Sequence, residues 1–225
     1  MRLNKFIAQA GVCSRRKADE LIENGQIKVN GKIVKELGTV IDEVKDDIYI
    51  GKRKLELAQQ KVYFALNKPV NYITSATSAQ GKSVMELVKT IKERVFPVGR
   101  LDKDSRGLII LTDDGDFAYK LTQAKFECEK EYEVTLDRPL LDKDKRLFER
   151  GLELEGKKLH PVKVIGQNGN KINLILKEGV NRQIRRMAEK QGYEVLDLKR
   201  VRIAKLKLGN LKEGGYIHIQ PSDVM

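Results

Sequence analysis

The sequence predicts an α+β protein with a small helix-and-hairpin unit at the N-terminus and a larger unit built on a mixed, mainly antiparallel sheet flanked by helices. Three observations favour this fold class. Few segments show the apolar period of a helix, many alternate as strands do, and strong hairpin signals lie at Asn30-Gly31 and at residues 167–170. Hairpins join antiparallel neighbours, so we expect most strands to pair in that way.

Residues 1–50 are expected to form the small unit. Apolar residues at helical spacing run from residue 3 to residue 10, and Gly11 follows them as a stop. Ser14 is a good cap for a second helix. The hairpin around Asn30-Gly31 and a short strand at 48–50 complete the unit.

The segment 51–61 is polar and weakly patterned, and we interpret it as a linker. Residues 62–225 then form the larger unit. Its helices are expected near 84–88, 116–121, 143–150 and 181–191, the last of them capped by Asn181. Its strands are expected near 62–66, 96–99, 108–112, 132–136, 162–165, 172–176, 195–198, 201–208 and 216–219.

The composition is strongly basic. Lys and Arg number 44 against 32 Asp and Glu, which gives a net charge of +12 and favours a polyanionic partner. The apolar runs are far too short to cross a bilayer, and the N-terminus lacks the apolar core of a signal peptide. Two cysteines outside any C-x-x-C unit and two isolated histidines predict a cytoplasmic protein without a metal site or membrane association.

The small unit carries a concentration of cations. Arg15, Arg16 and Lys17 stand at the start of the expected second helix, where positive charge opposes the helix dipole, and Lys28 lies on the hairpin. Local stability does not explain these residues well. We therefore expect them to contact RNA phosphates, although a solvated basic face is the alternative.

The stretch 98–112 places one carboxylate, Asp102, between Arg100 and Lys103, directly ahead of a buried apolar strand. A carboxylate held among cations at the mouth of a strand stays ionised and can be directed at a substrate. Taken alone, Asp102 is also compatible with an ordinary capping or loop role.

The helix expected from Asn181 carries three guanidinium groups on one stripe, at Arg182, Arg185 and Arg186. Because these groups repel one another, an anion is expected nearby, either phosphate or a catalytic carboxylate. A solvated helix face is the alternative interpretation.

Two resemblances cover essentially the whole chain. Residues 2–7, 11–19 and 27–32 resemble the S4 RNA-binding domain. Residues 99–105, 130–132 and 179–187, supported by 67–70, resemble the RsuA-type pseudouridine synthases of ribosomal RNA, which carry an N-terminal S4 domain. Within that family, residues 103–108 and 129–132 look most similar to the RluF-type enzymes of 23S ribosomal RNA.

The resemblance implies the pseudouridine synthase fold and a role for each part of the site. Asp102 is expected to be the catalytic carboxylate, Tyr132 the aromatic residue that packs on the target uracil, and Arg185 the cation paired with Asp102. Further RNA contacts are expected at Lys68, Arg100, Lys103, Lys130, Arg182 and Arg186. The implied partner is structured RNA, with 23S ribosomal RNA as the first expectation and transfer RNA as the second. No cofactor is expected, and the protein is expected to be a monomer.

Two other classes of function stay open from the sequence. One is a Mg²⁺-dependent nuclease that uses clustered carboxylates, for which the candidates are Asp102, Asp104, Asp113, Asp114 and Asp116. The other is a non-catalytic RNA-binding or ribosome-assembly protein, for which the S4-like unit alone would suffice.

Overall fold

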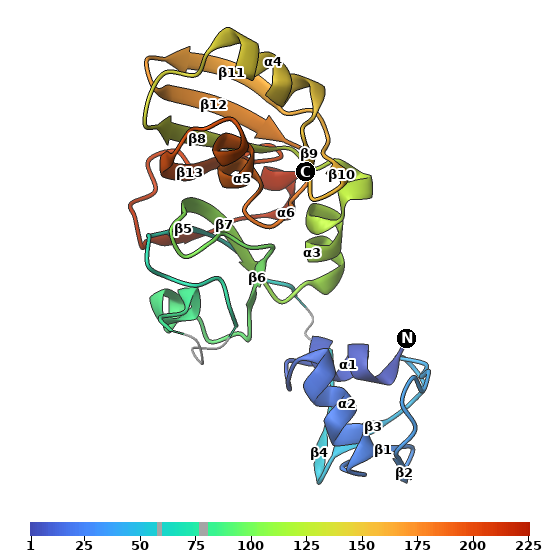
Figure 1. The fold of residues 1–225 in the computed structure, drawn as a ribbon. Coiled ribbons are helices and arrows are strands. Elements are labelled where there is room, and N and C mark those ends of the chain that lie inside the picture. Colours follow the sequence, from blue (N-terminus) through green and yellow to red (C-terminus); the bar gives the residue numbers. More distant parts are fainter. Residues whose placement is uncertain (58–59, 77–80) are drawn as a thin grey trace. The chain divides into compact units, whose positions relative to one another are not determined.

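The computed structural model describes residues 1–57, 60–76 and 81–225, and its contacts divide the chain into two compact units (Figure 1). The smaller unit contains Met1–Val62 together with Asp113–Gly115. The larger unit contains Tyr63–Thr112 and Asp116–Met225.

The smaller unit packs two helices on a four-stranded sheet. Helices α1 (Leu3–Gln9) and α2 (Arg15–Glu23) precede strands ordered β2 (Lys32–Val34), β1 (Ile27–Val29), β3 (Ile48–Ile50) and β4 (Arg53–Lys54). Its core consists of buried apolar residues from α1, α2, β1 and β3, from the segment before β3 and from the residue after β4. They are Leu3, Phe6, Ile7, Ala18, Ile22, Ile27, Ile41, Ile48 and Leu55. The two helices, the hairpin and the strand at 48–50 that the sequence predicts are confirmed.

Two local signals in this unit act as expected. The Ser14 hydroxyl accepts a hydrogen bond from the Lys17 backbone N–H at 3.2 Å and so caps α2. Asn30 and Gly31 both have positive φ, 51° and 79°, as a type I′ hairpin turn requires.

The first part of the expected linker packs on the smaller unit. Arg53–Lys54 pairs with β3, and the buried Leu55 donates its N–H to the Ile48 carbonyl at 2.8 Å. A two-residue strand made of cations has no readable alternation, which explains why the sequence pattern missed it. The remainder of that expected linker includes residues 58–59, which lie outside the described part. The boundaries at 50 and 62 stay a proposal.

The larger unit is built on a nine-stranded sheet within the described residues. Its main path runs β11 (Lys163–Asn168), β12 (Lys171–Leu176), β8 (Lys130–Leu136), β13 (Val195–Ile203), β7 (Arg106–Thr112), β5 (Tyr63–Lys68) and β15 (Tyr216–His218). Strands β14 (Leu206–Lys207) and β6 (Phe96–Val98) pair with β13 and β7. Among the strand pairs of this sheet, β13 with β7 is parallel and the others are antiparallel, which confirms the predicted mixed sheet.

The parallel pair depends on Gly107. A Cβ atom at this position would lie 2.3 Å from the carbonyl oxygen of Arg200, and the residue has φ +106°. Only glycine lets the start of β7 approach β13 so closely. The approach brings the segment before β7 next to the middle of β13.

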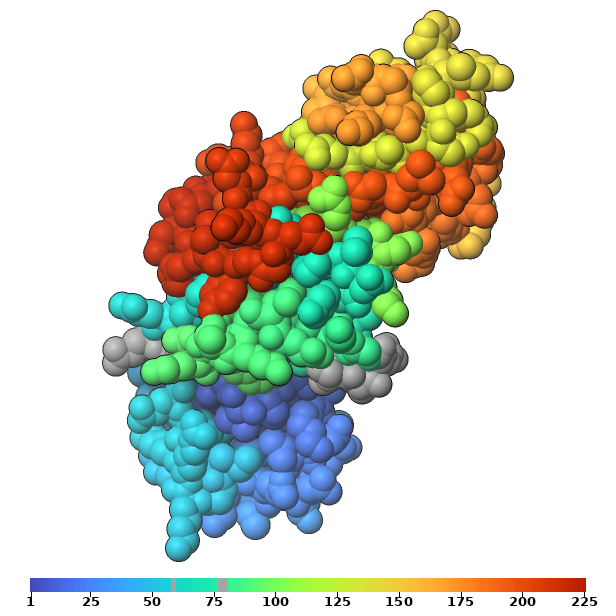
Figure 2. Space-filling model, turned by 90° about the vertical axis from the view of Figure 1, so that its left-hand side faces the viewer, coloured from blue at the N-terminus to red at the C-terminus, as the bar shows by residue number. Residues whose placement is uncertain are grey.

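Helices cover this sheet around two apolar clusters. Helix α4 (Asp142–Arg150) and helix α5 (Gln183–Lys190) pack over β11, β12, β8 and the start of β13 (Figure 1). Helices α3 (Gly115–Thr122) and α6 (Pro221–Val224) pack with β5, β7 and the end of β13. In the space-filling view α4 and the β11–β12 hairpin, yellow and orange, form one end of this unit (Figure 2). Short elements complete it: η1 (Val84–Val88), η2 (Ala124–Phe126), β9 (Glu153–Leu154) and β10 (Lys157–Lys158).

Three details of the larger unit differ from the sequence prediction. Asn181 is not the cap of α5; the N-cap position is Arg182, in the left-handed region at φ 49° and without a side-chain cap. Residues 195–203 form one strand where two were expected, because register shifts rather than a break interrupt the pattern. The turn of the β11–β12 hairpin is narrower than the four residues predicted, with Asn168 paired to Lys171.

In the part of the chain that the structure describes, no helix has the length and apolar character needed to cross a membrane.

Candidate active site

The segment 99–105 joins β6 to β7 and carries Asp102. Its backbone is held from outside at several carbonyl groups. The Thr74 hydroxyl donates to the Leu101 carbonyl at 2.8 Å and accepts from the Leu101 N–H at 3.1 Å, while the Asn71 N–H donates to the Lys103 carbonyl at 2.7 Å. Because these bonds are made by the backbone of the loop, they do not depend on its exposed side chains.

Lys68 is the buried anchor of the same loop. Its side chain is fully buried, and its ammonium group donates to the Ser105 carbonyl at 2.5 Å and to the Pro69 carbonyl at 3.0 Å. Burial lowers the pKa of Lys68 to about 8, against the opposing effect of the Asp104 and Asp102 charges. The expectation that Lys68 contacts RNA is therefore wrong, since a fully buried ammonium group cannot reach a phosphate.

Asp102 and Tyr132 line the same pocket, which has a volume of about 420 Å³. Tyr132 lies on β8 directly opposite Arg200 of β13, so the two side chains share one face of the sheet. Lys130 and the start of α5, with Arg182, line the pocket as well. The pocket belongs entirely to the larger unit.

Arg182 and Arg185, at the start of α5, contact Asp104 more closely than Asp102. Arg182 donates to both carboxylate oxygens of Asp104, each at 3.1 Å, and Arg185 Nε lies 3.2 Å from Asp104 Oδ2. Arg185 also donates to the Asp104 carbonyl at 2.9 Å and to the Val195 carbonyl at 2.8 Å. Asp102 Oδ2 is 4.0 Å from Arg182 Nη1. The expected pairing of Asp102 with Arg185 is thus not what the structure shows.

The physical reason is the turn before α5. Arg182 has the left-handed conformation at the start of α5, and from there its guanidinium reaches both carboxylate oxygens of Asp104. Burial raises the pKa of the Asp104 carboxyl, but the hydrogen bonds from Arg182 and the charges of Arg185 and Arg182 outweigh it and hold this pKa below its usual value. Asp104 therefore stays ionised and ties the loop to α5.

The remaining predicted contacts are placed as follows. Arg100 and Lys103 are exposed and line a second hollow on the other side of Asp102. Lys130 is half-buried, and its ammonium group donates to the Cys128 carbonyl at 2.9 Å. Arg186 forms an ion pair with Glu155 at 2.8 Å, whereas Arg182 and Arg185 contact Asp104.

Arg200 is a pocket residue that the sequence interpretation missed. It is 3 % exposed, its Nε donates to the Leu108 carbonyl at 2.7 Å, and its Nη2 has no hydrogen-bond partner. In the sequence, Arg200 is marked only by lying two residues after the buried Leu198, so that both side chains fall on the same face of the strand. An apolar residue would be usual at such a position.

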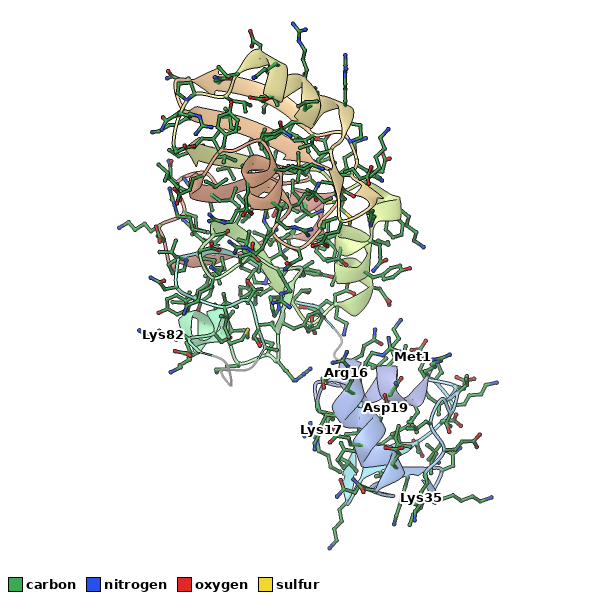
Figure 3. The ribbon with its side chains drawn as sticks, viewed as in Figure 1. Met1, Arg16, Lys17, Asp19, Lys35 and Lys82 are labelled. Carbon is green, nitrogen blue, oxygen red and sulfur yellow. The ribbon has the colours of Figure 1, made fainter. Side chains whose placement is uncertain are left out.

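The cations of the smaller unit lie on its surface. Arg15, Arg16, Lys17 and Lys28 are all exposed. Figure 3 labels Arg16 and Lys17 near the start of α2. Lys17 forms an ion pair with Glu20 at 2.6 Å, whereas the structure gives Arg15 and Arg16 no ion pair within the described residues. Their placement is compatible with phosphate contact and leaves that expectation as a prediction.

Comparisons with known proteins identify the family. Residues 62–190 match the family model described as RNA pseudouridylate synthase, and residues 1–48 match the S4 domain. The chain belongs to the RNA pseudouridine synthase family. A pseudouridine synthase is an isomerase that converts uridine in RNA to pseudouridine, and this confirms the class of enzyme that the motifs predict.

Relatives of this pseudouridine synthase match it along most of its length. It is 42% identical to the ribosomal large subunit pseudouridine synthase B of Bacillus subtilis, over 99% of this chain and 93% of the relative. It is 40% identical to the dual-specificity RNA pseudouridine synthase RluF of Escherichia coli K12, over 95% of this chain and 73% of the relative. A solved pseudouridylate synthase structure superposes with a TM-score of 0.72 at 31% identity, covering 99% of this chain and 97% of that chain.

These findings do not favour the two alternatives left open by the sequence. A pseudouridine synthase domain accompanies the S4 domain, so the RNA-binding function does not stand alone. The matching family and relatives are pseudouridine synthases, which does not favour a nuclease. Across residues 1–57, 60–76 and 81–225, no group of three or more His, Cys, Asp or Glu side chains is arranged to hold a metal ion.

Proposed function

We propose that this pseudouridine synthase isomerises one uridine in ribosomal RNA, and that the RNA is 23S. The names of the relatives support this target, since one is a ribosomal large subunit pseudouridine synthase. The observation that carries the proposed chemistry is the placement of Asp102 and Tyr132 in one pocket of about 420 Å³, a volume suited to a single nucleotide.

The reaction needs one ionised carboxylate close to the sugar. The N1–C1′ bond of uridine breaks, the uracil turns, C5 bonds to C1′, C5 loses its proton and N1 gains one. Atoms and charge balance without an oxidant or a group donor. Asp102 is proposed to act on the ribose or the base in the first of these steps, as carboxylates do in glycoside hydrolysis.

The target uridine must leave its stack to reach this pocket. Unstacking costs a few kcal/mol, and an aromatic face can return a comparable amount when it stacks on the base. Tyr132 is proposed to supply that face. Its position beside Arg200, on the sheet face that lines the pocket, supports the assignment.

The cations around the loop are proposed to have two roles, one structural and one in RNA binding. Arg182 and Arg185 hold Asp104 and thereby the backbone that aims Asp102. Arg100 and Lys103, exposed at the second hollow, are proposed to contact phosphates that flank the target nucleotide.

The smaller unit is proposed to bind the folded RNA through Arg15, Arg16 and Lys28, by charge and shape. The protein is further proposed to act as a monomer, because one chain lines the whole pocket. Its proposed location is the cytoplasm, where ribosomal RNA would be its substrate.

The proposal is tested by mapping pseudouridines in ribosomal and transfer RNA from cells with and without the gene. We expect one position in 23S RNA to lose its pseudouridine, and the gene supplied on a plasmid to restore it. A second plasmid carrying Asp102→Asn should fail to restore it. A lost position in transfer RNA or 16S RNA would overturn the 23S assignment, and no lost position in ribosomal RNA would overturn the proposed substrate.

A further inference from the structure

Two cations, the half-buried Lys130 and the buried Arg200, line the pocket beside Tyr132. Lys130 stands two residues before Tyr132 on β8, so both side chains leave the same face of the strand. Arg200 lies opposite Tyr132 on β13. All three residues line the pocket that contains Asp102.

Within the described residues, neither cation forms an ion pair. In the described part of the chain, the polar partners of Lys130 and Arg200 are backbone carbonyls: Cys128 for the ammonium group, and Leu108 and Arg100 for the guanidinium. Neither residue forms an ion pair with a carboxylate there. Burial lowers the pKa of Lys130, and the nearby charge of Arg200 lowers it further, opposed only by Cys128.

Two neighbouring cations without an anion are costly for the fold. Burying an unpaired charge destabilises a protein by several kcal/mol, and two like charges repel more strongly where water is excluded. Glu178, a buried carboxylate that lines the same pocket, accepts from the His160 N–H at 2.9 Å and from Gln183 Nε2 at 2.8 Å instead. Lys130 and Arg200 are thus available to pair with negative charge that a substrate brings into the pocket.

The position of this charge identifies its source. Arg200 is 3 % exposed, so it lies below the surface that a phosphate on the RNA backbone reaches. A base stacked on Tyr132, in contrast, would lie inside the pocket that Lys130 and Arg200 line. Uracil enters neutral, but when the N1–C1′ bond breaks with its electron pair on N1, the detached ring carries a negative charge shared with its carbonyl oxygens.

We propose that Lys130 and Arg200 stabilise the negative charge that develops on the uracil ring while it is detached from the sugar. Lys130 is the catalytic residue of the pair, because its half-buried ammonium group donates to a uracil carbonyl oxygen. Arg200 lies behind it and adds its field. The charge disappears when C5 has bonded to C1′ and N1 has taken up a proton, so both cations act on the transition state rather than on the bound substrate.

This inference rests on the proposed placement of the target uridine between Asp102 and Tyr132. Its test uses the full-length protein and whichever RNA the mapping experiment identifies. The RNA is prepared with uridine, or with 5-fluorouridine, at the target position. Fluorine withdraws electrons and stabilises the detached uracil anion. Cleavage of its N1–C1′ bond therefore depends less on stabilisation by Lys130 and Arg200.

We expect Lys130→Met to slow single-turnover consumption of the target uridine by about 100-fold, with RNA affinity unchanged within about twofold. On the 5-fluorouridine RNA the loss should shrink by at least about tenfold, since the leaving anion is already stabilised. Lys130→Arg should recover part of the rate. Arg200→Lys, which keeps the buried charge, should follow the same pattern with a smaller loss.

The matched control is Lys199→Met, which removes a cation from the next position of β13. Lys199 is not among the residues that line this pocket and lies near Glu133 at 3.8 Å, so both substrates should react at the parent rate. Equal losses of Lys130→Met on the two RNAs would overturn the proposal in favour of a structural role. A loss of RNA affinity at an unchanged rate would overturn it in favour of a phosphate contact. An active Asp102→Asn variant would instead refute the site itself.

Discussion

Arg182 holds Asp104 with two hydrogen bonds of 3.1 Å, one to each carboxylate oxygen. The bond pair fastens the loop that carries Asp102 to the first turn of α5. The same guanidinium is farther from Asp102, since Arg182 Nη1 is 4.0 Å from Asp102 Oδ2. The carboxylate proposed for catalysis is therefore aimed by its backbone, and its neighbour carries the structural ion pair.

Asp102→Asn should abolish pseudouridine formation, by about 1,000-fold or more, because the amide is neither a nucleophile nor a base. RNA affinity should change little, since Asp102 is not a cation and contributes no phosphate contact. The measurement is the pseudouridine content of the target RNA after incubation, with a filter-binding Kd beside it. A variant as active as the parent would refute the role of Asp102.

Arg182→Met and Arg185→Met should differ in their effect on thermal stability. Arg182 is half exposed, so its loss should lower kcat by about tenfold with a small change in Tm. Arg185 bonds two backbone carbonyls, so its loss should lower Tm as well as kcat. If Arg185→Met is inactive but fully stable while Arg182→Met reacts normally, the partner of Asp102 during the reaction is Arg185, as the sequence predicted.

Lys68→Met should change the pH dependence of stability. The folded-state pKa of Lys68, about 8, lies below the ordinary 10.5, so from pH 8 to 10.5 the unfolded chain holds a proton that the native state has released. The free energy of unfolding therefore rises across this interval, by up to about 3 kcal/mol.

The variant should lack this rise in denaturation curves taken from pH 7 to 10.5, while Lys143→Met, which removes an exposed lysine, should keep it. Parallel profiles for the parent and Lys68→Met would contradict the assigned shift.

Gly107→Ala should destabilise the larger unit by about 3 kcal/mol or more, because the added Cβ would meet the Arg200 carbonyl at 2.3 Å in a backbone conformation unsuited to alanine. Gly166→Ala is the control, since its Cβ would meet no atom closer than 4.0 Å. Thermal unfolding followed by circular dichroism compares the two. Equal Tm values would mean that β7 and β13 are less closely apposed.

Replacing Arg15 and Arg16 by Gln should weaken RNA binding and reduce the slope of log K against log salt by about one for each lost phosphate contact. The pseudouridine-forming step at saturating RNA should keep its rate, because neither residue lies in the pocket unit. Lys45→Gln removes an exposed cation from the same unit and serves as the control. An unchanged salt slope would show that Arg15 and Arg16 form only a solvated face.

The parts of the fold that the sequence predicts well are those set by neighbouring residues. The Ser14 cap and the Asn30-Gly31 turn need only a few residues of context, and each forms as predicted. Lys68 is different, because its burial depends on the Ser105 carbonyl, 37 positions along the chain. Arg200 likewise looks like one more cation in a basic stretch until β8 and β7 are placed beside it.

The candidate site divides in the same way. Its motifs place Asp102 and Tyr132 in one pocket, as predicted, although their chemical roles stay predictions. Arg182 has a positive φ, which the sequence does not reveal since arginine rarely adopts that conformation, and both Arg182 and Arg185 contact Asp104. Which carboxylate an arginine reaches is a matter of loop geometry, and spacing along a helix does not determine it.

Because every residue that lines the pocket belongs to the larger unit, the two units are exposed to different selection. If the smaller unit binds the RNA as proposed, substitutions on its surface would change which RNA is bound without altering the residues that line the pocket. Over evolutionary time, descendants of one such chain can thus acquire new targets by drift at the periphery, while the chemistry is inherited unchanged.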